Sequence, residues 1–267
     1  MPACAVLSGA RWCHKAWLCL LMALLISWPV EARAAVIRVA AAASLQHALP
    51  EMVSAFEKQS PHRLRVSFGS SGQFAAQIQQ GAPFELFLSA DESYVQRVQA
   101  AGLTQDAGVL YALGRIVLFA PTGSALVPER GLTGLKQALA QGRIKHLAIA
   151  NPAHAPYGRA AREALQATQI WPLPKPARLL QGENASQAAQ FALSGSAEAG
   201  ILPYSLVVSP AFQGRGTYAL IPDTLHQPLR QRMVLLTSAG APAREFYAYL
   251  QKPIARQIFG RYGFVLP

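Results

Sequence analysis

The sequence predicts an α/β protein of two lobes, each a mainly parallel sheet flanked by helices. Short apolar runs alternate with amphipathic stretches along the chain, as in parallel strands connected by helices that cover both faces of a sheet. Two such series follow one another in the 233 residues from Ala35 to Pro267, which predicts two lobes. A hydrophobic content of 52% with only 14% charged residues excludes a disordered chain.

The first 34 residues have the pattern of a cleaved export signal. Arg11 and Lys15 precede an apolar run at 16–28, and small residues follow at Ala32 and Ala34. The run is short for a spanning helix, which takes roughly 20 apolar residues. The sequence therefore predicts a signal peptide over 1–34, with an uncleaved membrane anchor as the alternative.

Removal of this segment changes what chemistry the chain can carry. Cys4, Cys13 and Cys19 all lie within it, so the exported chain would contain no disulfide, catalytic thiol or cysteine-bound metal. It would keep 21 basic against 12 acidic residues, without basic clusters. This excess indicates either a generally basic surface or long-range attraction of a small anion, and no nucleic-acid partner.

The first series begins directly after the export signal. Apolar residues recur at helical spacing within 45–59, where Pro50 delays the regular helix to about Leu49, and they alternate as in a strand within 64–68. Gly81 can end a helix over 72–80, and Asp91 can cap the helix that follows it. The predicted strands lie at 36–42, 64–68 and 84–90, and the predicted helices at 45–59, at 72–80 and after Asp91.

The second series contains more and shorter strands. Strands are predicted at 115–120, 144–150, 178–181, 199–202, 218–221 and 233–237. Helices are predicted at 159–168, after Asn184, at 245–252 and at 254–262. The Gly-, Pro- and Ser-rich tract at 122–131 follows a strand and is predicted to be a surface loop.

Four strand-to-helix junctions carry small or hydroxyl side chains, at Ser44, 70–71, 157–158 and 184–185. The first-turn N–H groups of a helix lack internal partners and attract anions. Because such junctions lie at the carboxyl ends of parallel strands, where ligands bind, two junctions in each lobe predict an anion between the lobes. The alternative is that each serine or asparagine only caps its helix.

No catalytic motif is complete in this chain. The histidines are not spaced as helical metal ligands, and the turn at 68–72 does not fit G-x-S-x-G because Gly69 and Gly72 enclose only two residues. The prediction is that the protein is not an enzyme. A secreted serine hydrolase with Ser71 as nucleophile is the alternative from another class, and it needs a histidine and an acid beside Ser71.

Five motifs, taken in order, resemble one family over essentially the whole exported chain. They are VAAAASL at 39–45, FGSSG at 68–72, GAPFELFLSAD at 81–91, NP at 151–152 with PYG at 156–158, and RYGF at 261–264. Together they are similar to the periplasmic molybdate-binding proteins of ABC transporters, within the bacterial solute-binding proteins. The resemblance implies the two-lobed periplasmic binding fold of type II, with an oxyanion held in the cleft between lobes joined by crossing strands.

The resemblance also implies boundaries and partners. The first lobe is expected at 35–113 plus 235–267 and the second at 114–234. Molybdate or tungstate would be the transported ligand, handed in the periplasm to the membrane permease of an ABC importer. The chain would act as a monomer without a cofactor, and no side chain would ligate the metal directly.

Individual residues follow from the same resemblance. Ser44 and Ser71 match two serines that donate both hydroxyl and N–H to the anion, and Ala185 matches a backbone donor. Tyr157 falls where the family uses a backbone N–H, and some members have tyrosine there. Many members also have a tyrosine after the strand matched at 199–202, which here is shifted by one residue to Tyr204, so Tyr157 is the alternative source of that hydroxyl.

The predicted site contains donors and no Arg or Lys. Charge-assisted hydrogen bonds from neutral donors are worth about 1.5–3 kcal/mol each, so several of them hold a dianion. A site of donors alone suits fully ionised molybdate, tungstate or sulfate. It disfavours protonated phosphate, whose O–H would lack an acceptor. Within this fold, sulfate is the alternative ligand.

Overall fold

The computed structural model describes residues 34–129 and 131–267, and residues 35–267 form one compact unit. The signal peptide expected at 1–34 lies outside the described residues except for Ala34, and it stays a prediction. Among the helices of the described part, none has the length and apolar character needed to cross a bilayer.

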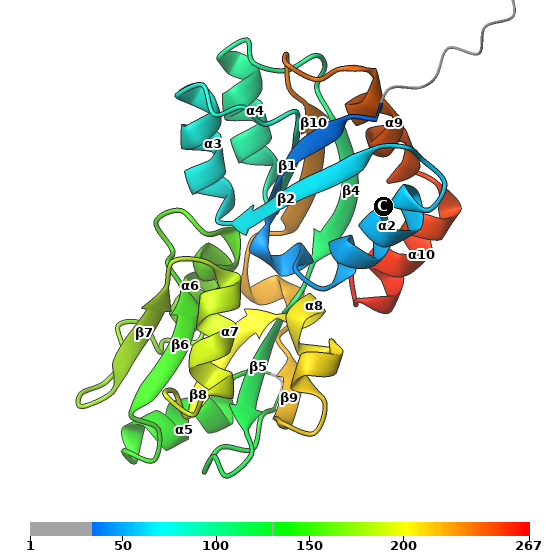
Figure 1. Cartoon of the computed structure of the whole chain (residues 1–267). Helices are drawn as coiled ribbons and strands as arrows, with labels where there is room; N and C mark the ends of the chain where they lie inside the picture. Colours follow the sequence, from blue (N-terminus) through cyan, green and yellow to red (C-terminus); the bar gives the residue numbers. More distant parts are fainter. Residues whose placement is uncertain (1–33, 130) are drawn as a thin grey trace, which may run out of the picture. The chain divides into compact units, whose positions relative to one another are not determined.

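Two five-stranded sheets share one pattern of strand order (Figure 1). The first has the order β2-β1-β3-β10-β4 and the second β7-β6-β8-β5-β9. In each sheet one strand, β10 or β5, runs antiparallel to both its neighbours, and the other four strands point the same way. The mainly parallel α/β fold expected from the sequence is therefore confirmed. The strands are β1 (Val36–Ala42), β2 (Arg63–Gly69), β3 (Leu86–Ser89), β4 (Val109–Gly114), β5 (Ile116–Pro121), β6 (His146–Ala150), β7 (Arg178–Gly182), β8 (Ala199–Pro203), β9 (Gly216–Leu220) and β10 (Leu229–Leu235).

Helices cover both faces of the first sheet. Val39 and Ala41 of β1 belong to the core cluster that includes α2, α9 and α10, whereas Ala40 belongs to the cluster formed with α3 and α4. This alternation follows from the two-residue period of a strand, which sends successive side chains to opposite faces. The helices of this part are α2 (Ala48–Glu57), α3 (Ser71–Gln79), α4 (Glu92–Ala100), α9 (Ala241–Tyr249) and α10 (Pro253–Arg261), with the 3-10 turn η1 (Ala43–Leu45) after β1.

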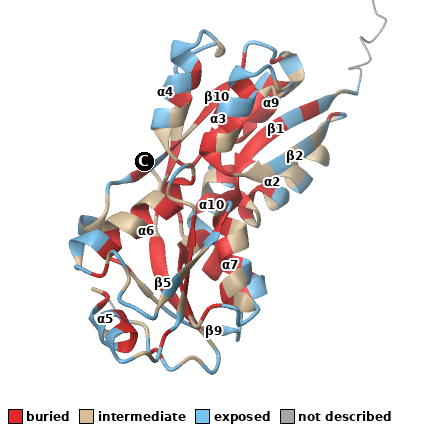
Figure 2. Ribbon diagram, turned by 90° about the vertical axis from the view of Figure 1, so that its left-hand side faces the viewer, coloured by how far each residue is buried: buried red, intermediate tan, exposed pale blue. Residues whose placement is uncertain are grey.

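The second sheet has its own core, to which α5, α6, α7 and α8 contribute. The central strands are buried in both sheets, whereas β2, at an edge, alternates between exposed and half-buried residues (Figure 2). We call the first sheet with its helices the first lobe and the second sheet with its helices the second lobe. The remaining elements are α5 (Thr133–Ala140), α6 (Pro156–Ala167), α7 (Ala185–Leu193), α8 (Tyr204–Val207), η2 (Pro210–Phe212) and η3 (Asp223–Leu225).

The chain crosses between the sheets twice, from β4 to β5 and from β9 to β10. β10 spans Leu229–Leu235, so it begins ahead of the strand expected at 233–237 and of the lobe boundary expected at 235. The first residues of β10 alternate between buried Leu229 and exposed Arg230, which hides the strand from a search for apolar runs. β4 and α5 are also elements that the sequence did not predict.

Candidate anion-binding site

The starts of three helices and one 3-10 turn meet at a small cavity between the two lobes. η1 and α3 reach it from the first lobe, and α6 and α7 reach it from the second. The cavity is narrow, and no charged side chain is among the residues that line it. These residues are Ala42, Ala43, Ser44, Gly69, Ser70, Ser71, Ala90, Ala155, Pro156, Tyr157 and Ala185. The structure thus brings four of the five predicted site residues together.

The first lobe contributes the hydroxyls of Ser44 and Ser71, which are both buried. Ser44 lies in η1, directly after β1, and its Oγ has no hydrogen-bond partner of acceptable geometry in the described part of the chain. Ser71 is the first residue of α3, and its Oγ accepts a hydrogen bond of 3.0 Å from the backbone N–H of Ala90. Because that bond uses a lone pair of the oxygen, the Ser71 proton is still available for a ligand.

These serines do not cap helices, which removes the alternative interpretation of the first-lobe junctions. Ser70 occupies the N-cap position of α3, but its side chain makes no capping bond and donates instead to the carbonyl oxygen of His154. The residue before η1 is Ala42, which has no side chain able to cap. The first-turn N–H groups at these two junctions are therefore not consumed by capping side chains.

The second lobe contributes Tyr157 and Ala185. Tyr157 is the second residue of α6, behind Pro156, and the N-cap residue Ala155 makes no side-chain capping bond. Ala185 is the first residue of α7, where Asn184 does cap, accepting from the N–H groups of Ser186 at 3.0 Å and Gln187 at 3.1 Å. The Asn184 side chain does not accept from the N–H of Ala185, so this cap leaves that N–H free to donate to an anion.

The Tyr157 hydroxyl is held as a neutral donor. Burial raises its pKa to about 12, against the opposing effect of the polar side chains around it. Those neighbours are Ser44, Gln231 and Ser205, and the amide nitrogen of Gln231 donates to the tyrosine oxygen at 2.8 Å. Tyr157 therefore keeps its proton throughout the neutral range.

The two lobes contact each other around this cavity through several hydrogen bonds. The N–H of Gly72 donates to the carbonyl of His154 at 3.0 Å, and Ser205 Oγ donates to the carbonyl of Ser44 at 2.8 Å. A Cβ atom at Gly72 would lie 2.7 Å from the His154 oxygen, so glycine is needed for this approach. The ends of the donor-bearing helices are thereby fixed relative to one another.

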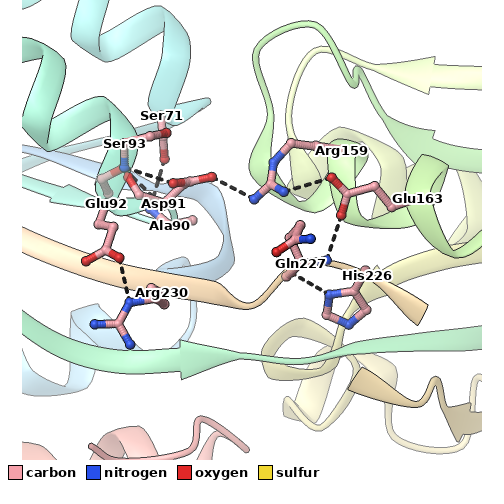
Figure 3. A network of polar contacts seen from close by, with 11 residues as sticks. Ser71, Ala90, Asp91, Glu92, Ser93, Arg159, Glu163, His226, Gln227 and Arg230 are labelled. Carbon is pink, nitrogen blue, oxygen red and sulfur yellow. Dashed lines mark hydrogen bonds and ion pairs between the residues drawn. The ribbon is translucent and has the colours of Figure 1, made fainter. Parts of the chain in front are cut away.

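An ion pair joins the lobes beside the cavity (Figure 3). Arg159 of α6 contacts Asp91 of the first lobe, with 2.7 Å between Nη2 and Oδ2, and it also pairs with Glu163. Burial acts to lower the pKa of the Arg159 guanidinium, but the two carboxylates outweigh burial and raise it. Asp91 follows Ala90, whose N–H donates to Ser71, and Arg159 lies two residues after Tyr157. Both members of the ion pair are therefore close in sequence to residues of the site.

Tyr204 does not line the cavity, which corrects the expectation that it supplies a hydroxyl there. Its ring lies 5.6 Å from that of Tyr218, and the Arg115 guanidinium lies 5.2 Å above it. Tyr204 opens α8, in which successive side chains are about 100° apart, so its neighbour Ser205 is directed at η1 instead. The one-residue shift after Pro203 explains the difference.

The hydrolase alternative finds no support around Ser71, whose oxygen is bonded to Ala90. The histidine near this turn, His154, lies 3.0 Å from Ser70 Oγ through Nδ1 and 3.4 Å from Glu183 through Nε2. However, Ser70 donates its proton to the His154 carbonyl, so Nδ1 is the donor to Ser70 and does not act as its base.

Ser70, Ser205 and Gln231 were not among the predicted site residues. Gln231 lies between Leu229 and Met233 on the buried side of β10. A polar residue at this inward position of the strand pattern is the feature that could have indicated a role at the site. Among the described residues, no group of three or more His, Cys, Asp or Glu side chains is placed to hold a metal ion.

Comparison with known proteins identifies the class. Residues 37–265 match the family of bacterial extracellular solute-binding proteins, and the chain belongs to this family. It is 34% identical over 247 residues to the molybdate-binding protein ModA of Rhodobacter capsulatus, covering 91% of this chain and 94% of the relative. It is 35% identical over 238 residues to ModA of Azotobacter vinelandii, covering 88% and 92%.

A solved structure agrees with these relatives. The periplasmic molybdate-binding protein of Azotobacter vinelandii superposes with a TM-score of 0.77 at 29% identity, over 86% of this chain and 99% of that one. A sulfate-binding protein of Mycobacterium tuberculosis superposes with a TM-score of 0.70, but at 13% identity this likeness concerns the fold alone.

Proposed function

We propose that this protein is the periplasmic solute-binding component of an ABC importer, which binds molybdate and tungstate and delivers them to a membrane permease. The observation that carries the proposal is the convergence of four neutral donor elements on one small cavity between the lobes. Relatives at 34–35% identity over most of the chain bear the name molybdate-binding protein, which supports the choice of anion. The protein acts as a carrier and not as an enzyme.

The chemistry of the lining supports a fully ionised tetrahedral anion. The Ser44 hydroxyl is buried with no hydrogen-bond partner of acceptable geometry among residues 34–129 and 131–267. Leaving a buried polar group unsatisfied costs about 1–3 kcal/mol, so an oxyanion there would relieve the penalty. The lining side chains offer hydroxyl donors, and none is a carboxylate that could accept a proton from a monoprotonated phosphate. Ser44, Ser71, Tyr157 and Ala185 are the proposed ligand-binding residues.

Calorimetric titration of the purified chain with molybdate, tungstate, sulfate and phosphate tests the assignment. Molybdate and tungstate should bind and raise the melting temperature, because a ligand that binds only the folded state stabilises it by mass action. Phosphate should have little effect. Binding of sulfate without molybdate would establish the alternative oxyanion, and turnover of an active-serine probe at Ser71 would replace the carrier with a hydrolase.

Export and assembly belong to the same proposal. The pattern in residues 1–34 supports cleavage after Ala34, so N-terminal sequencing of the periplasmic fraction should find a chain that begins at Ala35 or within a few residues of it. The exported chain would work as a monomer, without a cofactor or nucleic acid, and light scattering checks its mass. Recovery of an intact N-terminus in the membrane would replace the cleaved signal with an anchor.

A further inference from the structure

A chain of three buried polar side chains leads from the first sheet to Tyr157. Tyr111 lies on β4, Gln231 on β10 and Tyr157 on α6, and their residues are 3%, 0% and 3% exposed. Tyr111 Oη lies 2.8 Å from Gln231 Oε1, and Gln231 Nε2 lies 2.8 Å from Tyr157 Oη. These hydrogen bonds therefore connect β4, which precedes one crossing between the sheets, with β10, which follows the other crossing, and with the anion cavity.

The donors and acceptors in this chain have one direction. The Tyr111 hydroxyl is closer to Gln231 Oε1, at 2.8 Å, than to the carbonyl oxygen of Ser89, at 3.2 Å, so it donates to the amide oxygen. The amide of Gln231 is thereby oriented, since its oxygen faces Tyr111 and its nitrogen must face Tyr157. An amide nitrogen can only donate, so the Tyr157 oxygen accepts and its own proton is left for another acceptor.

The backbone leaves room for this contact. A Cβ atom at Gly114, the last residue of β4, would lie 2.5 Å from Tyr157 Oη and 2.6 Å from Gln231 Nε2. Any side chain at this position would push the two groups apart. The space at Gly114 is thus a second feature, independent of the hydrogen bonds, that favours the pairing of Gln231 with Tyr157.

We propose that Gln231 is a positioning residue for oxyanion binding. By donating to the Tyr157 oxygen, it directs the Tyr157 proton into the cavity and keeps that side of the site a donor. The consequence is selectivity for ligands that present only acceptors there. This inference rests on the function proposed above and adds to it a residue that does not line the cavity.

A double-mutant cycle separates positioning from stability. Tyr157→Phe should weaken molybdate binding roughly 10–100-fold through loss of a charge-assisted bond, and Gln231→Met, which keeps the side-chain length, roughly 5–10-fold. If Gln231 acts through the tyrosine hydroxyl, Gln231→Met should change affinity less than about twofold in the Tyr157→Phe background. Equal losses in both backgrounds would overturn the proposal.

A pH profile gives a readout that a structural role would not move. In Gln231→Glu, a protonated carboxyl reproduces the amide, accepting from Tyr111 and donating to Tyr157, whereas a carboxylate accepts from both tyrosines and repels the anion. Burial raises the pKa of an introduced carboxyl, which brings this change toward neutral pH. The affinity of the variant relative to wild type, measured at each pH, should rise as pH falls. A ratio independent of pH would overturn the proposal.

Two further variants keep the test decisive. Tyr111→Phe retains Gln231 and the ring packing and removes only the hydroxyl that orients the amide, and it should weaken binding roughly 2–5-fold. Ser209→Ala is the control, because Ser209 is buried and bonded within the second lobe at Leu206, outside the cavity lining. It should lower the melting temperature without changing affinity. Failure of wild type to bind any of the four anions would overturn the proposed function itself, whereas wild-type binding with unchanged affinity in Gln231→Met and Tyr111→Phe would overturn the role of Gln231 alone.

Discussion

The two lobes approach the cavity with equivalent elements but supply different groups. In both, the turn or helix that follows a parallel strand begins at the cavity, as the shared strand order requires. The first lobe presents the hydroxyls of Ser44 and Ser71, whereas the second presents the Tyr157 hydroxyl and backbone N–H groups such as that of Ala185. Capping differs too, since among these junctions only α7 has a side-chain cap, from Asn184.

This difference separates the donors that belong to side chains from the donors that belong to the backbone. A serine hydroxyl can be deleted without moving the backbone, so first-lobe donors can be tested one at a time. A backbone N–H survives every substitution except proline, so backbone donors such as that of Ala185 are altered mainly through what holds their helices in place, whereas the Tyr157 hydroxyl can be deleted directly. Removal of a side chain that donates to the anion should therefore lower affinity, whereas removal of a side chain that only caps a helix should lower the free energy of unfolding.

The largest expected effect is the removal of the two serine hydroxyls. Ser44→Ala and Ser71→Ala should each weaken molybdate binding by about 1.5–3 kcal/mol, or roughly 10–150-fold, because each loses a charge-assisted donor. Their effects on the ligand-free protein should differ. Ser44→Ala removes a hydroxyl that has no hydrogen-bond partner of acceptable geometry among the described residues and should lower stability little, whereas Ser71→Ala leaves the buried N–H of Ala90 without an acceptor and should cost about 1–3 kcal/mol.

Calorimetric titration with melting curves of the ligand-free variants measures both quantities. Ser194→Ala is a matched control, since its exposed hydroxyl bonds only within its own turn, at Phe191 and Ser196. Wild-type affinity in both cavity variants would show that the anion binds elsewhere. An equal loss of stability in both would contradict the assignment of an unpartnered hydroxyl to Ser44.

Four of the five residues proposed from the sequence line one cavity, whereas two elements of the frame around it, β4 and α5, were not predicted. Each of the four follows a strand that is recognisable as an apolar run. Local pattern places the starts of α3 and α7 to within one residue, whereas α6 begins at Pro156, ahead of the helix expected at 159–168. Because carboxyl ends of parallel strands share one edge, their meeting at a single cavity follows from topology.

What local pattern does not encode is pairing across long separations. Gln231 matters because β10 returns to the first sheet and brings it to Tyr157, 74 positions away in sequence. The Arg159–Asp91 pair likewise joins different lobes, 68 positions apart. Tyr204 was misplaced for the opposite reason, because a shift of one residue at the start of a helix turns a side chain to another face.

The next largest effect concerns the ion pair that joins the lobes. Asp91→Asn keeps the capping oxygen for Ser93 but loses the charge opposite Arg159, whose side chain is only 27% exposed. We expect affinity for molybdate to fall by about 1–1.5 kcal/mol, or roughly 5–10-fold, because the contact holds the lobes together around the ligand. Glu163→Gln is the control, since it leaves the Arg159–Asp91 contact in place and changes only the bonds of Glu163 to Arg159 and to the N–H of Gln227. Titrations at low and high salt should show a smaller salt effect in Asp91→Asn than in wild type, and equal affinities would argue against the contact.

A smaller effect is expected from the capped helix of the second lobe. Asn184→Ala removes the side-chain acceptor for the N–H groups of Ser186 and Gln187, which should lower the free energy of unfolding by about 1 kcal/mol. Affinity should stay within about twofold of wild type, because a change of 0.4 kcal/mol or less is expected when the Ala185 N–H is retained. Urea unfolding and titration of the same variant measure the two quantities. A loss of affinity comparable to that of Ser44→Ala would mean that Asn184 itself donates to the anion.

The smallest effect is a pH dependence confined to the first lobe. Burial acts to raise the pKa of Glu92, but Arg230 and Arg232 outweigh it, so the pKa lies below the ordinary value. A carboxylate whose folded pKa is depressed stabilises the protein above its unfolded pKa, and this contribution is lost as pH falls through the folded pKa. Glu92→Gln should therefore lower the free energy of unfolding by up to about 1 kcal/mol at neutral pH, and the difference from wild type should shrink below roughly pH 4. Urea unfolding across this range tests it, with Arg232→Gln in both backgrounds to show that the effect depends on the pairing. A difference that stays constant with pH would place the effect of Glu92 in packing and not in its charge.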